Sequence, residues 1–336
     1  MRELLVAGLA LVLLGGVFQG SFMYPSKHIK GWAWENYWLI FAATAYVACP
    51  WIIAALTVPR LPEVYSGLAP GPVVSTLIFG FGWGLGAVLF GLGVDALGMA
   101  LGFAVILGIT ATAGTVIPLI VNPPDSFTLR QGVLTALALG LMLCGVVICS
   151  FAGRWKEHSA ANPHRGSYTR GLAICIGSGL LCACGNLGFA FGADISRRAQ
   201  SLGATEHLAV NALWVVLVFP MFLCNCGYSA WLLHKNGTAA LYRLPGSLRM
   251  SALAVLMGAM WMAGMSLYGG GARSLGALGP SLGWAILMSS MVLIANALGL
   301  VSGEWEEARP RAKRQLGVGI AVLLLAITVL GYANRA

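Results

Sequence analysis

Three carboxylates at the ends of long apolar runs are the residues of this sequence best suited to bind and release a proton. They are Glu35, Asp95 and Asp194. An ionisable group that borders an apolar medium is costly, so such a group usually serves ion or proton coupling. Glu35 has the most suggestive position, because it begins an apolar run directly after Trp32 and Trp34. A first-turn carboxylate that only complements the helix dipole is the structural alternative.

Aromatic and amide side chains inside the apolar runs form a second set, with the chemistry of a sugar site. Its members are Trp83, Trp261, Tyr24, Tyr268, Gln19, Asn186, Asn211 and Asn296. Rings stack on the apolar face of a pyranose and amides hydrogen-bond its hydroxyl groups, a combination that is common in small-molecule pockets. Packing is the alternative for each tryptophan. The amides must face a partner or a cavity in either case, because an unpaired amide in an apolar medium is unfavourable.

The placement of histidine and cysteine argues against an enzyme or a metal protein. All five histidines fall at the joints between apolar runs or at their ends, so no nucleophile in mid-run has a general base at its own depth. The eight cysteines lie inside the runs, and the members of each Cys-x-Cys pair point to different sides of a helix. We therefore expect no catalytic residue, no metal site and no cofactor.

The composition excludes a water-soluble globular protein. The 336 residues are 58% hydrophobic and 9% charged, and the mean hydropathy is +0.83, whereas soluble domains are about 25% charged. The formal net charge of +9 does not indicate a nucleic-acid partner, because the basic residues form short clusters between apolar runs. This charge distribution is typical of a protein that crosses the membrane several times.

Hydropathy predicts the elements that must position the candidate residues. A bilayer core needs roughly 20 apolar residues per helix, and ten runs qualify. They lie near 4–24, 36–58, 72–94, 97–121, 130–152, 170–193, 208–233, 248–271, 277–301 and 314–333. Without a period-2 alternation, these runs favour an all-α membrane protein with ten transmembrane helices over a barrel. The length of the first run favours a retained helix over a cleaved signal peptide.

The distribution of Lys and Arg predicts the orientation. Of the 20 basic residues, 13 fall in the joints after the first, third, fifth, seventh and ninth runs, and 7 fall on the other side. Because cytoplasmic loops carry the excess of positive charge, these five joints are expected in the cytoplasm and both termini outside.

An internal repeat relates the two halves of the chain. At an offset of 178 residues, Trp83 aligns with Trp261 and several glycines align with glycines. Pro50 likewise answers Pro220, and Phe22 answers Phe189, at offsets of 170 and 167. We expect a first repeat over 1–152, a cytoplasmic linker over 153–169 and a second repeat over 170–336. Five helices per half require the second repeat to be inverted, and inverted repeats with interrupted helices are typical of alternating-access transporters.

Several local motifs carry a resemblance to a known family. They are Lys27 and Lys30, Trp32-x-Trp34-Glu35, Pro50-Trp51, Trp83-Gly84-Leu85-Gly86, Leu97-Gly98-Met99, Gly108-Ile109-Thr110, Met260-Trp261, Tyr268, Trp284 and Glu304-Trp305. On these residues the chain resembles the L-rhamnose–proton symporter family of the drug/metabolite transporter superfamily, over essentially its whole length. The second half departs from that pattern, with Gly264, Leu278, Gly279 and Pro280 where the family is polar.

The resemblance implies the fold and a function. The fold is the drug/metabolite transporter fold of two inverted five-helix repeats. The function is proton-coupled import of a small neutral sugar, a deoxy-sugar such as L-rhamnose, across the inner membrane. The partners are then the sugar, protons and the lipid bilayer, with no nucleic acid. An exporter or facilitator of another metabolite stays open, and a membrane-embedded enzyme is disfavoured by the histidine positions. The short 153–169 linker argues against a sensor with a soluble output domain.

Overall fold

The computed structural model describes residues 2–121, 128–157, 168–303, 305–306 and 308–333, and every regular element within them is helical. In chain order, the elements of the first half are α1 (Arg2–Ser21), η1 (Tyr24–His28), α2 (Trp34–Ala43), η2 (Thr44–Ala48), α3 (Cys49–Thr57), α4 (Leu61–Ser66), α5 (Pro70–Leu97), α6 (Met99–Val121) and α7 (Leu129–Glu157). Those of the second half are α8 (Tyr168–Phe191), α9 (Ala193–Ser201), α10 (Val210–Asn236), η3 (Thr238–Arg243), α11 (Ser247–Ser274), η4 (Gly276–Leu278), α12 (Gly279–Val301) and α13 (Pro310–Ala333).

Ten helical segments of the described residues are long and apolar enough to cross a membrane. They cover Leu4–His28, Trp34–Thr57, Pro70–Leu97, Leu101–Val121, Leu129–Gly153, Tyr168–Ser201, Val210–Asn236, Ser247–Ser274, Gly276–Val301 and Pro310–Ala333. Each segment overlaps one predicted run, so the predicted number and positions of the spans are confirmed. Helices suit this environment because lipid offers no partner for backbone N–H and C=O groups.

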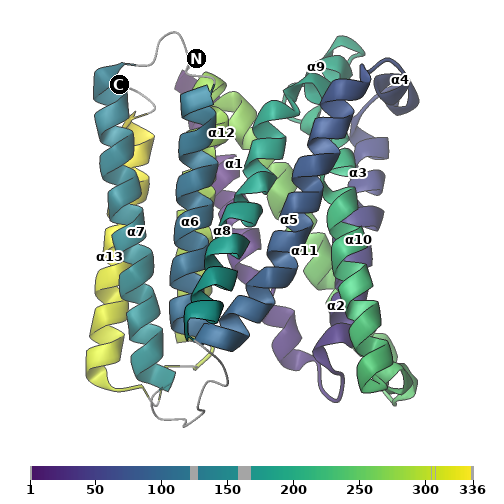
Figure 1. Cartoon of the computed structure of the whole chain (residues 1–336). Coiled ribbons are helices and arrows are strands. Elements are labelled where there is room, and N and C mark those ends of the chain that lie inside the picture. Colours follow the sequence, from purple (N-terminus) through teal and green to yellow (C-terminus); the bar gives the residue numbers. More distant parts are fainter. Residues whose placement is uncertain (1, 122–127, 158–167, 304, 307, 334–336) are drawn as a thin grey trace.

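The spans form a bundle with two distinct ends (Figure 1). The first turn of α1 and the last turn of α13 lie at the same end, together with α4 and α9, which we call the α4–α9 face. The opposite end carries η1, the start of α2 and η3, and we call it the η1–η3 face. Part of the predicted linker, residues 158–167, lies outside the described residues, which include α7 to Glu157 and α8 from Tyr168.

Helices far apart in the sequence pack side by side in the bundle. α1 lies against α11 and α12, α5 lies against α8 and α10, and α6 lies against α8. α7 and α13 form a pair at one edge of the bundle, joined to the rest through α6 and α12 (Figure 1). The centre is therefore built by helices from both halves of the chain.

Glycine permits the closest helix contacts. A Cβ atom at Gly80 of α5 would lie 2.0 Å from the carbonyl oxygen of Leu217 in α10, and one at Gly279 would lie 1.7 Å from that of Ala272. No side chain fits at either position without moving a backbone. This observation agrees with the role of small residues at helix interfaces within membranes.

The two prolines that suggested matching interruptions behave differently. Before Pro50, the segment Thr44–Ala48 is a π-turn that separates α2 from α3. A proline has no N–H to bond the preceding turn, and a π-turn accommodates that loss by adding one residue. Pro220, in contrast, lies inside the uninterrupted helix α10. The expectation of an interrupted helix is thus correct for the first half and wrong for the second.

Candidate functional site

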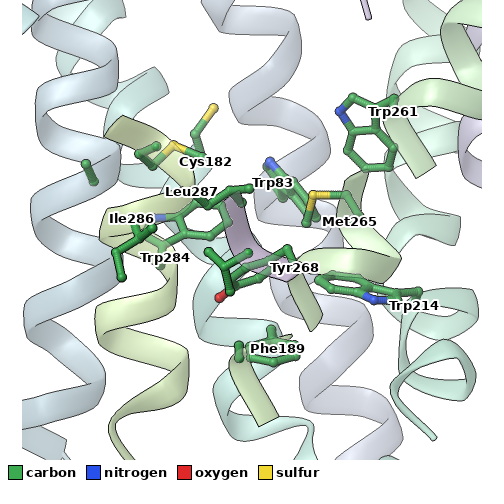
Figure 2. Close-up of a cluster of buried hydrophobic side chains, with 14 of the residues drawn as sticks. Trp83, Cys182, Phe189, Trp214, Trp261, Met265, Tyr268, Trp284, Ile286 and Leu287 are labelled. Atoms are coloured by element: carbon green, nitrogen blue, oxygen red, sulfur yellow. The ribbon is translucent and has the colours of Figure 1, made fainter. Parts of the chain in front are cut away.

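Trp83 of α5 and Trp261 of α11 meet near the middle of the bundle. Their ring centroids are 5.6 Å apart and their planes are inclined by 42°. The two rings are only 8% and 6% exposed, and Figure 2 shows them beside Met265 within a larger aromatic cluster. Tyr46 of the π-turn contacts the Trp261 ring edge-on, at 5.0 Å. Three spans therefore present rings to one place.

Gln19 joins this place from α1. Its Nε2 donates a hydrogen bond of 2.7 Å to the backbone oxygen of Trp261. Gly264 makes room for this amide, because a Cβ there would lie 2.9 Å from the same Nε2. The absence of a side chain at position 264 thus has a local structural reason.

Asn186 and Tyr268 form a buried network beside the tryptophan pair. The Tyr268 hydroxyl donates to Asn186 Oδ1, and Asn186 Nδ2 donates to the backbone oxygens of Gly114 at 2.7 Å and Pro280 at 2.8 Å. The network links α6, α8, α11 and α12. Both polar ends of the Asn186 amide are used by the protein, so in this conformation the residue locks helices together.

The structure does not bring the other three predicted binding residues to the tryptophan pair. Asn211 Nδ2 donates to Thr57 Oγ1 at 3.0 Å and so ties α10 to α3. Asn296 Nδ2 bonds the backbone oxygen of Val292 in its own helix at 2.8 Å. Tyr24 is 38% exposed and lies edge-on to His28 in η1.

The three predicted carboxylates differ in their surroundings. Glu35 is 4% exposed, and its Oε1 accepts hydrogen bonds from Asn236 Nδ2 at 2.9 Å and Thr238 Oγ1 at 2.7 Å. Asp95 is exposed near the end of α5. Asp194 pairs with Arg197 one turn away, and the two side chains are 46% and 66% exposed. Of the three, only Glu35 is buried.

Further hydrogen bonds around Glu35 connect the same two segments. Asn36 Nδ2 donates to the backbone oxygen of Thr238 at 3.0 Å, and the Tyr242 hydroxyl donates to that of Asn36 at 2.8 Å. Trp32 Nε1 donates to the backbone oxygen of Leu241 at 3.0 Å. Burial raises the pKa of Tyr242, so this hydroxyl keeps its proton. We call these contacts between residues 32–36 and 236–242 the Glu35 latch, which joins the start of α2 to the end of α10 and to η3 at the η1–η3 face.

Sequence reasoning missed three residues that the structure places near the candidates. Tyr46 contacts Trp261, as described above. Asn225 of α10 is buried and accepts a 3.1 Å hydrogen bond from Trp38 Nε1, which ties α10 to α2. Arg273 lies over the Phe189 ring at 5.2 Å. The signal for Asn225 was its polarity inside an apolar run. The signal for Arg273 was a charge two residues beyond the end of one, and Tyr46 gave no signal that distinguishes it from a packing residue.

These features define a class of protein: a multi-pass α-helical membrane protein with an aromatic and amide centre shared by both halves of the chain. A family model described as L-rhamnose-proton symport protein (RhaT) matches residues 1–336. The chain belongs to this family, whose members are transport proteins and not enzymes.

Individual relatives agree with the family match over nearly full length. The chain is 27% identical to the L-rhamnose-proton symporter of Escherichia coli O1:K1 and 28% identical to that of Escherichia coli strain ATCC 8739, in each case over 98% of both chains. It is 27% identical to the L-rhamnose-proton symporter of Shigella boydii serotype 18, again over 98% of both chains.

Proposed function

We propose that this protein imports L-rhamnose, or a closely similar deoxy-sugar, together with protons across the bacterial inner membrane. The observation that carries the proposal is the family match, which spans residues 1–336. The relatives described above are L-rhamnose-proton symporters, and the match covers 98% of their length. Export, facilitated diffusion and membrane-embedded catalysis are not favoured by any of these relationships.

The tryptophan pair is our candidate for the centre of the sugar site. Trp83, Trp261 and Tyr46 offer ring surface, and Gln19 adds an amide at the same depth. Aromatic walls with a few polar groups suit the two faces of a deoxy-sugar, one apolar and one hydroxylated. Asn186 and Tyr268 lie beside the tryptophan pair. They would contact the sugar if the hydrogen bonds of their network were broken. Asn211, Asn296 and Tyr24 have no contact that supports a binding role.

Glu35 is our candidate for proton coupling. Its ionised carboxylate can accept both hydrogen bonds of the latch on Oε1, and such bonds to a charged acceptor are stronger than neutral ones. Protonation would weaken them and so loosen the contact between α2 and α10. A proton at Glu35 would in this way favour opening of the η1–η3 face, which the charge distribution assigns to the cytoplasm. Asp95 and Asp194 are the weaker candidates because neither is buried.

Equivalent contacts in the two halves support inverted repeats over 1–152 and 170–336. In the α1–α11 contact, Cβ atoms at Gly8 and Gly15 would meet the carbonyl oxygens of Gly271 and Gly264, each at 2.9 Å. In the α8–α5 contact, Cys175 and Cys182 lie against Gly93 and Gly86. The two sets of contacts correspond through the offsets noted in the sequence. An offset of 167 relates Gly8 and Gly15 of α1 to Cys175 and Cys182 of α8. An offset of 178 relates Gly93 and Gly86 of α5 to Gly271 and Gly264 of α11. Such symmetry is what alternating access through a drug/metabolite transporter fold requires.

Uptake into proteoliposomes tests the function. With a pH gradient that is acid outside, we expect L-rhamnose to accumulate inside, and a protonophore should abolish the accumulation. L-mannose, which differs by one hydroxyl group at C6, is the matched control sugar and should be taken up less well. Equilibration of L-rhamnose without accumulation would indicate a facilitator. Accumulation inside the proteoliposomes only when the pH gradient is reversed, with the acid side inside, would indicate an exporter.

A further inference from the structure

A groove lies between α7 and α13, the helix pair at the edge of the bundle (Figure 1). It has a volume of about 380 Å³. Its lining residues are Ile148 of α7 and Arg311, Arg314, Gln315 and Val318 of α13. The last turn of α13 lies at the α4–α9 face, so these residues near its start lie toward the η1–η3 face. Arg311, Arg314 and Val318 are exposed, and the groove is therefore open to the surroundings of the bundle.

The chemistry of the groove changes along its length. The four lining residues of α13 share one face of that helix, because they follow the spacing i, i+3, i+4 and i+7. The rise from Arg311 to Val318 is about 10 Å. The two arginines lie nearest the end of the membrane span, and Gln315 comes next. Val318 and Ile148 lie furthest into their spans, so the polar end of the groove faces the membrane surface and its apolar end faces the membrane interior.

A phospholipid presents its groups in the same order. Its phosphate lies at the membrane surface, its ester groups lie just below, and its acyl chains fill the interior. Guanidinium groups suit phosphate oxygens, because each can donate two parallel N–H bonds. Gln315 Oε1 is buried and has no hydrogen-bond partner among the described residues. An amide carries donors as well as an acceptor, so Gln315 can turn its NH2 group to an ester oxygen at this depth.

The charge of the groove selects among phospholipids. Its lining contains two arginines and, among the described residues, no carboxylate. The nearby Lys313 is engaged elsewhere, since its Nζ donates to the backbone oxygen of Glu306 at 3.1 Å. A lipid with a net negative charge therefore suits the groove better than phosphatidylethanolamine, whose ammonium group the arginines would repel. Basic pockets between membrane-spanning helices on the cytoplasmic side bind acidic headgroups in this way.

We propose that this groove binds an anionic phospholipid of the leaflet at the η1–η3 face. The lipid phosphate lies on Arg311 and Arg314, and an acyl chain runs along Val318 and Ile148. Because both helices line the groove, the lipid bridges α7 and α13 and stabilises their pairing. The inference is independent of the transported sugar, since it concerns a site that neither the tryptophan pair nor the Glu35 latch shares.

Lipid binding to the purified full-length protein tests the proposal. Native mass spectrometry measures the affinity for phosphatidylglycerol and for phosphatidylethanolamine with the same acyl chains. We expect the wild type to prefer phosphatidylglycerol by on the order of thirtyfold, because each arginine contributes about fivefold. In the double variant Arg311→Gln/Arg314→Gln, the preference should fall below about threefold. Arg243→Gln/Arg249→Gln is the matched control, since it removes two exposed charges near the same face outside the groove, and it should keep the preference.

A further variant, Gln315→Leu, tests the order of groups along the groove. Both lipids carry ester groups, so this variant should weaken both by about fivefold and leave the preference unchanged. Loss of the preference in Gln315→Leu would contradict the proposed order.

Three other results would refute the lipid site. The first is an unchanged preference in Arg311→Gln/Arg314→Gln, and the second is an equal loss in the control variant. The third is displacement of the bound lipid by inorganic phosphate, which has no acyl chain and should not compete. A wild-type dimer that dissociates in Arg311→Gln/Arg314→Gln without any bound lipid would assign the groove to a second copy of the chain instead. None of these measurements depends on sugar transport, so the proposed function stands or falls separately.

Discussion

The indole rings of Trp83 and Trp261 pack together with their centroids 5.6 Å apart, although the two residues lie 178 positions apart in the chain. They come from α5 and α11, and the internal repeat of the sequence aligns them with each other. A sugar that binds between the halves must either replace this ring contact or stack on its outer surfaces. The pair is thus the ring surface that we propose for the sugar.

Removing either ring should weaken sugar binding. Trp83→Ala or Trp261→Ala is expected to cost about 1–2 kcal/mol of binding free energy through loss of one stacked face, or roughly 5–30-fold in Kd. Equilibrium binding of L-rhamnose to the purified variants measures this loss. Trp231→Ala is the control, because Trp231 is 51% exposed and should not affect affinity. Equal affinity in all three variants would contradict the assignment.

Replacing Glu35 by glutamine should separate coupling from binding. Glu35→Gln keeps an oxygen that can accept from Asn236 and Thr238, but it removes the titratable proton. We expect sugar exchange to continue and accumulation driven by a pH gradient to disappear. Counterflow and gradient-driven uptake in the same proteoliposomes measure the two activities.

Two matched variants make the coupling test specific. Asp95→Asn and Asp194→Asn remove the other carboxylates and should leave accumulation intact, since Asp95 is exposed and Asp194 is paired with a neighbour on its own helix. Accumulation that survives in Glu35→Gln and fails in one of these would move the coupling site to that residue.

Cysteine labelling tests the orientation. Ala240 in η3 and Ser66 in α4 are exposed at opposite faces of the bundle. In a background without native cysteines, Ser66→Cys should react with an impermeant thiol reagent on intact cells. Ala240→Cys should react only after the membrane is opened. The reverse pattern would invert the orientation assigned from the basic residues.

Two glycines of α5 should respond oppositely to the same substitution. Gly91→Ala introduces a Cβ with nothing within 4 Å and should stabilise the helix by about 0.5–1 kcal/mol. Gly80→Ala pushes a Cβ against the Leu217 carbonyl oxygen and should cost about 1–3 kcal/mol. Thermal unfolding in detergent measures both shifts. Similar shifts for the two variants would mean that α5 and α10 do not approach as closely as described.

The sequence was sufficient to predict the ten spans, because their hydropathy is a property of local composition. It also indicated that the intramembrane amides need partners, but it could not say which. The Asn186 amide donates to two backbone oxygens and accepts from the Tyr268 hydroxyl. Every residue has a backbone oxygen, so the order of side chains in the sequence cannot predict which ones Asn186 bonds. Tyr46 escaped notice because the π-turn before Pro50 inserts a residue and so changes which side chains share a helical face.

The pair formed by α7 and α13 lies apart from the proposed sugar and proton sites. Gly145 packs on Leu323 and Gly319 packs on Cys149, so the two helices hold each other closely. Neither contributes a side chain to the tryptophan pair, the Asn186–Tyr268 network or the Glu35 latch. Substitutions that preserve the α7–α13 contact are therefore expected to leave the proposed sugar and proton sites unchanged.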